Sequence, residues 1–442
     1  MNNDILKERF AVKAVEIKEQ YNALKNDHSE FVVGEYNVGQ IIGGMRGMTG
    51  LLYETSILDA EEGIRFRGYS IPQLRDLLPK WGGGSEPLPE GIFYLMLFNE
   101  IPTENDVKLV TEQWTLRADV PQHVLDTLDS LPAGTHPMTQ FTIGVMALQN
   151  YSKFAAAYRD GVNKNSYWEF MYEDVMDLIA KLPRIAAYIY RRTYKNSEHI
   201  APNDNLDWAG NFAHMLGFSS DEFCDLMRLY QTIHVDHEGG NVSAHTTKLV
   251  GSALSDAYLS FAAALNGLAG PLHGLANQEV IRWILDMKEE MGDKFTDRDA
   301  IADYIHKTLQ EGRVVPGYGH AVLRQTDPRF IAQREFAQRH NINDQVIQAV
   351  NAIFEIAPAI LSETGKIKNP WPNVDAHSGA LLVYYGLIEY DFYTVLFGVS
   401  RSLGVLASLI LDRYLGLPLE RPKSVTIDSL LAEINSKARV TN

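Results

Sequence analysis

Hydrophobic residues recur at helical spacing along most of the chain. From Met171 to Leu182 the apolar side chains follow the three-and-four spacing of one helix face. Pro183 is then expected to interrupt or kink the helix that continues through RIAAYIYRRTY. A thinner apolar stripe over Ile5 to Lys25 predicts a surface helix. Only residues 31–69 break this period: FVVGEYNV, LLYETSIL and GIRFRGYS are short β-like pieces around glycines and predict a small hairpin region.

The fold class predicted by these patterns is mainly α, with a minor β-hairpin region near the N-terminus. At 442 residues the chain is long for a single core, so two domains are expected. WGGGSEPLPEG (81–91) is predicted to be a loop, and helical segments resume after it. The candidate hinges are GLAGPLHG (267–274) and the region after Gly379, because both lie beside polar clusters. No fixed-period repeat is visible.

Charge and composition restrict the possible partners. The formal net charge is −16, from 40 basic and 56 acidic residues, which argues against a general nucleic-acid or anionic-membrane surface. The long apolar stretch VLFGVSRSLGVLASLIL contains Arg401 and looks too short to span a membrane. The single cysteine, Cys224, excludes an intramolecular disulfide and is expected to be a small buried residue.

The first residues, MNNDILKERF, resemble neither a signal peptide nor a transit peptide. They favour a cytoplasmic protein. The alternative is a protein of the mitochondrial matrix whose presequence has been removed.

Two polar clusters centre on histidines. IHVDHEGGNVSAH holds His234, His237 and His245, but Gly-Gly-Asn after the His-Glu pair ends a helix where a zinc motif needs a second ligand. A hydrogen bond from a histidine to a ligand or to the backbone is favoured over a metal. In GLAGPLHGLANQEV, His273 is expected near a helix N-terminus, where the dipole keeps the ring neutral. It could polarise a substrate oxygen or simply cap the helix.

A third cluster is VVPGYGHAVLRQTDPR. Gly317 and Gly319 allow close backbone approach to a ligand and leave amides for it, while His320 reaches across. Together with Arg324 and Arg329 this stretch fits recognition of carboxylates or phosphate, because guanidinium groups pair with planar anions. The alternative is a solvated surface loop.

The fourth cluster, KIKNPWPNVDAHSG, places Asp375 just before a long apolar run. A carboxylate at such an edge is a plausible general base, because partial desolvation raises its pKa. An N-cap of a helix beginning near Ala380 is the alternative. Arg401 must be paired or must reach a polar cavity, because an unpaired buried charge is too costly. Arg421, in ERPKS, fits a solvated loop.

Taken together, HEGGNVSAH, GPLHGLANQEV, VVPGYGHAVLRQTDPR, NPWPNVDAHSG and LFGVSRSLG resemble the motifs of the citrate synthase family, in its eukaryotic-type branch. GGMRGM, EEGIRFRGYSIP and EPLPEG extend the resemblance, which covers about residues 33–423 in family order. The resemblance implies condensation of acetyl-CoA with oxaloacetate, followed by thioester hydrolysis to citrate and CoA. No metal and no cofactor beyond the substrates are implied.

The resemblance also implies roles for single residues. His273 would hydrogen-bond the thioester oxygen, Asp375 would remove the methyl proton, and His320 would polarise the ketone of oxaloacetate. The oxaloacetate carboxylates would be held by His237, Arg329, Arg401 and, from the neighbouring subunit of a homodimer with shared sites, Arg421. The residues implied for CoA are Arg46, Lys164, Val314, Val315, Gly317, Tyr318, Gly319, Arg324, Lys366, Lys368 and Asn373. Lys164 departs from the family pattern, because relatives commonly have arginine there, and its lost bidentate fork predicts weaker CoA binding.

The family fold adds a domain division. Residues 1–273 and 380–442 would form a large, dimer-forming helical domain, and residues 274–379 a small domain that closes over the active site and excludes water. Three other functions compete with this one. They are 2-methylcitrate synthesis from propionyl-CoA, a non-catalytic ligand-binding relative, and a metallohydrolase built on His234, His237 and His245.

Overall fold

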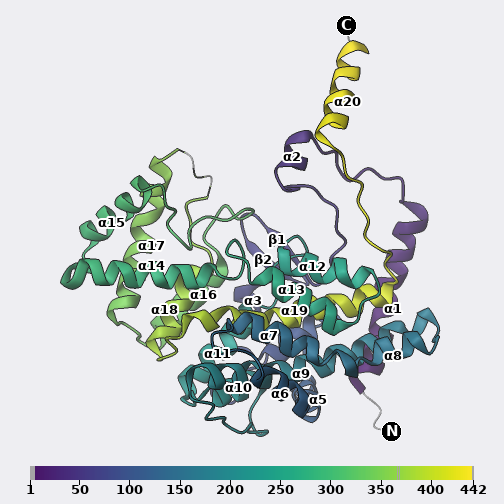
Figure 1. Cartoon of the computed structure of the whole chain (residues 1–442), viewed down its shortest axis with the longest axis horizontal. Coiled ribbons are helices and arrows are strands. Elements are labelled where there is room, and N and C mark those ends of the chain that lie inside the picture. The colour runs from purple at the N-terminus through teal and green to yellow at the C-terminus, as the bar shows by residue number, and fades with distance from the viewer. Residues whose placement is uncertain (1–4, 366, 368, 441–442) are drawn as a thin grey trace.

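The computed structural model describes residues 5–365, 367 and 369–440, and these are mostly helical (Figure 1). The α-helices are α1 (Ile5–Asp27), α2 (Val38–Ile42), α3 (Ile71–Leu77), α4 (Pro89–Phe98), α5 (Glu104–Arg117), α6 (Gln122–Asp129), α7 (Pro137–Ala147), α8 (Lys153–Arg159), α9 (Tyr167–Tyr194), α10 (Trp208–Leu216), α11 (Asp221–Ile233), α12 (Val242–Ser252), α13 (Ala257–Leu268), α14 (Ala276–Met291), α15 (Arg298–Gln310), α16 (Pro328–Arg339), α17 (Gln345–Glu363), α18 (Asp375–Tyr384), α19 (Tyr393–Leu415) and α20 (Ile427–Val440). Four short 3₁₀ turns lie at Gln149–Tyr151, Lys164–Ser166, Gly292–Lys294 and Tyr390–Phe392 of the described chain. The mainly α class predicted from the sequence is confirmed.

The core is built around α19, which runs through the middle of the body and packs against α9, α12, α4 and α13 (Figure 1). It is 23 residues long, more than its broken sequence pattern suggested. Two segments of the described chain, Gln345–Glu363 and Tyr390–Leu415, are long and apolar enough to cross a membrane. The most apolar window of Tyr390–Leu415 is 100% buried inside the protein and that of Gln345–Glu363 is 56% buried, as in the core helices of a packed domain.

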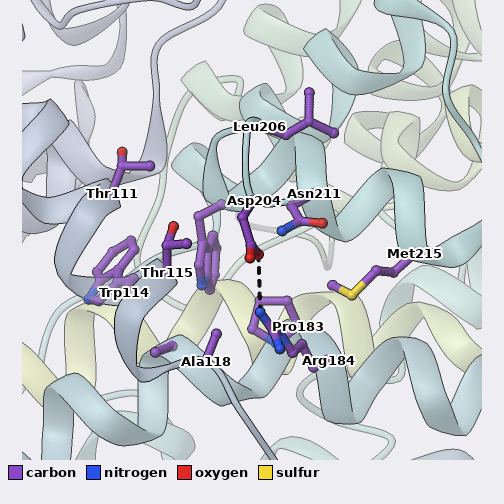
Figure 2. Close-up of a pocket in the computed structure, with 12 residues that line it drawn as sticks. Thr111, Trp114, Thr115, Ala118, Pro183, Arg184, Asp204, Leu206, Asn211 and Met215 are labelled. Carbon is purple, nitrogen blue, oxygen red and sulfur yellow. Dashed lines mark hydrogen bonds and ion pairs between the residues drawn. The ribbon is translucent and has the colours of Figure 1, made fainter. Parts of the chain in front are cut away.

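Pro183 does not interrupt α9, which is 28 residues long and has the proline in its interior. Proline lacks the N–H that would bond the carbonyl of Ile179 one turn earlier. That carbonyl instead accepts a hydrogen bond from the indole Nε1 of Trp208, at 3.1 Å. Figure 2 shows the small cavity beside Pro183, where Arg184 and Asp204 form an ion pair at 3.2 Å. The indole supplies the donor that the proline lacks, so the helix continues unbroken through Pro183.

The β region is smaller than the sequence predicted. Strands β1 (Ser56–Asp59), β2 (Gly63–Phe66) and β3 (Tyr69–Ser70) form an antiparallel sheet in chain order, with Ser56 opposite Phe66. The prediction of a strand in FVVGEYNV is wrong, because residues 31–37 pair with no strand of the described chain. Phe31, Val32 and Val33 are each more than 70% exposed. An alternating pattern becomes a strand only when a neighbour can take up its hydrogen bonds.

Helices α14 to α17 gather at one end of the molecule, where α18 joins them to the body (Figure 1). An ion network connects this end to α3 and the following loop. Glu86 is fully buried and accepts from Arg75 through both oxygens, at 2.8 and 2.9 Å, and from Arg339 at 2.7 Å. The division into domains 1–273 with 380–442 and 274–379 remains a prediction. In Figure 1, α2 and α20 project beyond the body.

Candidate active site

A cavity of about 620 Å³ lies where α14, α16 and α18 meet the body. It is lined by six of the seven residues predicted for catalysis or oxaloacetate binding and by three of those predicted for CoA. These are His237, His273, His320, Arg329, Asp375 and Arg401, and, for CoA, Arg46, Gly319 and Asn373. The first six come from five separate segments of the chain. Their convergence on one cavity is therefore a product of the fold and not of closeness in sequence.

The loop after α11 forms one wall of the cavity. Helix α11 ends at Ile233, and the backbone then turns through Glu238, whose φ of +58° lies in the left-handed region. Asn241 caps the next helix, α12, by accepting from the amide of Ala244 at 3.1 Å, and its Nδ2 donates to the carbonyl of His237 at 3.0 Å. His237 is thereby fixed with its Nε2 buried and without a partner in the described chain. Burial lowers the pKa of His237 well below its usual range, and Arg329 and His320 act in the same direction.

Arg401 is buried in the middle of α19 and is held by three acceptors. Its Nε donates to the carbonyl of His234, and its Nη1 donates to Asn241 Oδ1 and Ser243 Oγ, all at 3.0 Å. The His234 carbonyl lies at the C-terminal end of α11, where the helix dipole favours a cation. Burial lowers the pKa of Arg401 to about 10, while Asp236 raises it, so the guanidinium remains protonated at neutral pH.

Arg329 is paired with a buried carboxylate. Its Nε and Nη2 donate to the two oxygens of Asp327, at 3.0 and 2.6 Å, and the amide of Arg329 donates to the same carboxylate. Burial alone would raise the pKa of Asp327, but the guanidinium outweighs it and holds that pKa below its usual value. The pair orients Arg329 at the start of α16, where the residue lines the cavity.

His273 lies in the turn just before α14, close to the predicted helix N-terminus. The backbone N–H of Ser243 donates to its Nε2 at 3.3 Å, and Ser243 Oγ lies 3.0 Å from the same nitrogen. Because Nε2 accepts from a backbone amide, the proton of the neutral ring is on Nδ1. Burial, with Arg401 nearby, lowers the pKa of His273 to about 3. The ring is therefore a neutral hydrogen-bond donor at physiological pH.

His320 shows the same arrangement with the nitrogens exchanged. Its Nδ1 accepts from the amides of Val322 and Leu323, at 3.0 and 3.1 Å, so the proton of the neutral ring is on Nε2. Burial and then Arg329 lower the pKa of His320 to about 4. The ring lies 5.2 Å from that of His237, centroid to centroid. Two neutral imidazoles, His273 and His320, thus present N–H donors in one cavity.

The glycines beside His320 shape the backbone, and the Gly319 amide expected for a ligand is already bonded within the chain. Gly317 and Gly319 have φ of +79° and +98°, which side chains rarely adopt. A Cβ on Gly317 would also meet Ala376 at 3.0 Å, in the turn that carries Asp375. The amide of Gly319 is not available to a ligand, however, because it donates to the carbonyl of Trp371 at 3.0 Å. The glycines thus bring the His320 turn against the Asp375 turn.

Asp375 is the first residue of α18 and does not cap a helix beginning near Ala380. Its amide donates to Asn373 Oδ1 at 3.0 Å. Burial raises the pKa of its carboxyl to about 7, against the lowering influence of Arg329 and Arg401. A carboxylate with this pKa is matched to accepting a proton at neutral pH.

Among the residues that the structure describes, the others predicted for CoA do not line this cavity in the single chain. Val315 and Gly317 are buried, Tyr318 is half-buried beside Pro372, and Val314 is 78% exposed. Arg324 is exposed, and its Nη1 donates to the carbonyls of Val322 and Leu323 at 2.6 and 2.7 Å. Lys164 and Arg421, the two residues expected to serve the neighbouring subunit, are both exposed. Lys366 and Lys368 lie outside the described residues.

Sequence reasoning missed four residues that hold the site. Asn241 and Ser243 carry Arg401 and His273, Asp327 pairs with Arg329, and Asp236 accepts from Tyr53, Thr55 and Ser56 beneath the His237 loop. Two of them could have been predicted as helix N-caps, because Asn241 follows two glycines and Asp327 precedes a proline. Nothing in the sequence marks Ser243 or Asp236.

The three histidines considered for a metal do not converge. His234 Nδ1 is bonded to the Tyr230 carbonyl at 2.8 Å, and His245 Nε2 lies 3.4 Å from Glu420 Oε2. Across the described residues no group of three His, Cys, Asp or Glu side chains is placed to hold a metal ion. Cys224 is buried, as expected, and burial raises the pKa of its thiol.

Comparison with known proteins identifies the family. The model of the family "Citrate synthase, C-terminal domain" matches residues 44–423. The chain belongs to the citrate synthase family. It is 58% identical to the mitochondrial citrate synthase of Xiphias gladius and 59% identical to that of Daucus carota, in each case over 94% of this chain and 88% of the relative. The reaction class is therefore that of a citrate synthase, an acyltransferase.

Solved citrate synthases share the fold. The structure from Pyrobaculum aerophilum is 27% identical, with a TM-score of 0.77 over 90% of this chain and 97% of that one. The enzyme from Thermoplasma acidophilum, solved as a ternary complex with carboxymethyl coenzyme A and oxaloacetate, has a TM-score of 0.74 at 22% identity, over 89% of this chain and 97% of that one. At that identity the likeness shows the fold alone.

The cytoplasmic location expected from the first residues is wrong. The relatives from Xiphias gladius, Daucus carota and Glossina morsitans morsitans are all named as mitochondrial enzymes. The composition of the first residues alone therefore did not predict the location.

Proposed function

We propose that this member of the citrate synthase family condenses acetyl-CoA with oxaloacetate in the cavity described above, and that the roles implied by its motifs hold residue by residue. The observation that carries the proposal is the set of protonation states in one cavity. Asp375 has a pKa of about 7, while His273 and His320, with pKa values of about 3 and 4, are neutral donors. A weak base and two neutral donors that line one cavity suit enolisation followed by attack on a ketone.

In the first step the Asp375 carboxylate takes a proton from the methyl group of acetyl-CoA. The C–H bond breaks, and its electron pair forms the enol double bond as the thioester oxygen gains negative charge. Nδ1–H of His273 donates to that oxygen, because Nε2 is occupied by the Ser243 amide. The donor is needed because a carboxylate is far too weak a base to remove this proton alone.

In the second step the enol carbon attacks the ketone carbon of oxaloacetate, forming the C–C bond of citryl-CoA. The thioester carbonyl re-forms as its enol electron pair moves into the new bond, and the ketone oxygen takes up a proton to become a hydroxyl. Nε2–H of His320 is the proposed hydrogen-bond donor to that oxygen, because Nδ1 already accepts from the Val322 amide. Arg329, Arg401 and His237 hold the two carboxylates of oxaloacetate, and their placement on the cavity wall supports this role. Water then cleaves the thioester to give citrate and CoA.

The active form is proposed to be a homodimer with shared sites. Arg421 is exposed and makes no hydrogen bond or ion pair with any described residue, as expected of a side chain that serves the partner subunit. The exposed apolar residues Phe31, Val32 and Val33 in the same single chain support a partner that covers them. Lys164, Arg46 and the residues around Val314 are proposed to meet CoA, and closure of residues 274–379 is proposed to exclude water. No cofactor beyond the two substrates is proposed, and the mitochondrial matrix is the proposed location.

The deciding experiment is thiol release from acetyl-CoA, followed spectrophotometrically with and without oxaloacetate, with propionyl-CoA run in parallel. Oxaloacetate-dependent release that favours acetyl-CoA supports the proposal. A preference for propionyl-CoA would assign 2-methylcitrate synthesis with the same residues, since one methylene is discriminated by only about 1–3 kcal/mol. No release from either would contradict the catalytic roles.

A further inference from the structure

The segment that carries Arg421 is an extended connection between the buried helix α19 and the projecting helix α20. It leaves α19 at Gly416, whose φ of +72° ends the helix, and it remains irregular until Ile427. The end of α19 is fixed by Lys18, whose Nζ donates to the carbonyls of Tyr414 and Leu415, at 2.9 and 2.6 Å. Beyond that point the segment needs a second contact with the body of the protein if Arg421 is to occupy a defined position.

Glu420, the residue before Arg421, supplies that contact. Its backbone N–H donates to Ser252 Oγ at 3.0 Å, and its Oε2 lies 3.4 Å from His245 Nε2. Both partners are on α12, more than 160 positions earlier in the chain. Oε1 of Glu420 is buried without a partner among the described residues. Its neighbours Pro418, Leu419 and Arg421 are all exposed, so Glu420 is the point where the segment is held to the body.

Helix α12 also belongs to the active site of its own subunit. Its cap residue Asn241 and its second residue Ser243 hold Arg401 and His273, as described above. One turn and three turns further on, His245 and Ser252 hold the Arg421 segment. The same rigid helix therefore contacts both the local site and the segment proposed to complete the partner's site.

We propose that Glu420 is a positioning residue for oxaloacetate binding in the partner subunit, where it fixes the backbone from which Arg421 enters that site. The inference rests on the proposed role of Arg421 in trans. Holding the backbone next to the arginine removes in advance backbone freedom that the segment would otherwise lose on binding, which is the physical gain from preorganisation. Glu420 itself touches neither substrate.

The first test compares Michaelis constants of purified variants. Glu420→Ala is expected to raise KM for oxaloacetate about tenfold, the effect of one lost charge-assisted contact, and to leave KM for acetyl-CoA unchanged. Glu420→Gln, which keeps the size and one acceptor oxygen, is expected to recover part of the loss. Glu279→Gln is the matched control, because it breaks a surface ion pair with Arg282 on α14 and is expected to change neither constant. An unchanged KM for oxaloacetate in Glu420→Ala would overturn the inference.

The second test separates action on the partner from action within the same subunit. Heterodimers of a Glu420→Ala subunit and an Asp375→Asn subunit, isolated with two different tags, have one site with an intact base. That site lies in the Glu420→Ala subunit but receives Arg421 of the partner subunit, whose Glu420 is native. We expect its KM for oxaloacetate to be that of the unaltered enzyme. A KM as high as that of the Glu420→Ala homodimer would mean that Glu420 acts on its own site, and would refute the inference.

A parallel heterodimer tests the underlying proposal by itself. An Arg421→Gln subunit paired with an Asp375→Asn subunit should regain a native KM for oxaloacetate if Arg421 acts in trans. If this heterodimer remains defective, the role of Arg421 in the partner's site is wrong. If it is restored and the Glu420→Ala heterodimer is not, only the positioning role of Glu420 fails.

Discussion

Asp375 holds a carboxylate where the surroundings disfavour its charge, so removing the charge should stabilise the fold while it abolishes activity. The perturbation is Asp375→Asn, which keeps the shape. The carboxyl has a pKa of about 7 in the folded protein, against 3.8 as the reference value. At about 1.4 kcal/mol per pKa unit, ionisation of the folded state at pH 8 costs at most about 4 kcal/mol. Because Asp375 is partly open to the cavity, we expect about 1–2 kcal/mol to be realised.

The sign of the effect depends on pH in a defined way. Below about pH 4 the carboxyl is protonated in both the folded and the unfolded chain, so Asp375→Asn and the unaltered protein should be equally stable. As the pH rises from about 4 to 7, only the unfolded chain releases the proton, and the unaltered protein loses stability relative to the variant. Above pH 7 the difference should be constant.

The assay is thermal unfolding at fixed protein concentration between pH 4 and 8, with thiol release measured on the same samples. For a chain of 442 residues the expected gain corresponds to about 1–2 °C in Tm at pH 8. The rate should fall about 100- to 10,000-fold, as for other lost general bases. A variant that is less stable at pH 8, or a difference that does not vary with pH, would refute the reasoning that burial raises the pKa of Asp375.

Three further expectations are measurable with the same material. The kcat/KM for acetyl-CoA should fall about tenfold per pH unit below about pH 7, as the carboxyl of Asp375 becomes protonated, with no second ionisation from His273 or His320 above pH 5. An acid limb that begins only near pH 4 would contradict this. Glu86→Gln should destabilise the protein by about 1–3 kcal/mol in urea unfolding, because the buried guanidinium of Arg75 then keeps only Glu335 as a carboxylate partner; an unchanged midpoint would mean that the network contributes nothing. Trp208→Phe should lower the free energy of unfolding by about 1–3 kcal/mol, because it leaves the Ile179 carbonyl without a donor. The loss should be much smaller in a Pro183→Ala background, where the backbone N–H of residue 183 can bond that carbonyl. Equal losses in both backgrounds would show that the indole does not replace the missing backbone donor.

The sequence predicted which residues line the cavity better than it predicted the contacts that hold them in place. His273, His320 and Asp375 stood in motifs whose glycines and prolines marked irregular backbone, and the structure places all three on one cavity. The tautomer of each ring could not be predicted, because it depends on the amides of Ser243 and Val322, which fold against the rings from other elements or from the following turn.

The predictions that failed did so because they used local rules alone. Pro183 was expected to interrupt or kink a helix, and the interruption does not occur, because the compensating donor comes from Trp208, 25 positions later and on another helix. The alternating residues 31–37 were expected to pair, and the described chain offers them no partner strand. The expectation that Gly319 would leave its amide for a ligand ignored Trp371, which takes it. In each case a contact distant in sequence decided the outcome.

Arg401 also has a consequence for the chain before it is folded. Helix α19 and the turn before it are long and apolar enough to be taken for a membrane anchor. An arginine near the middle of such a segment costs about 2.5–3.5 kcal/mol on membrane insertion, comparable to the contributions of several leucines. The side chain that is proposed to bind a carboxylate in the folded enzyme therefore also opposes stable insertion of the nascent segment into a bilayer. Replacing it by leucine would remove a binding group and, at the same time, a safeguard against mistargeting.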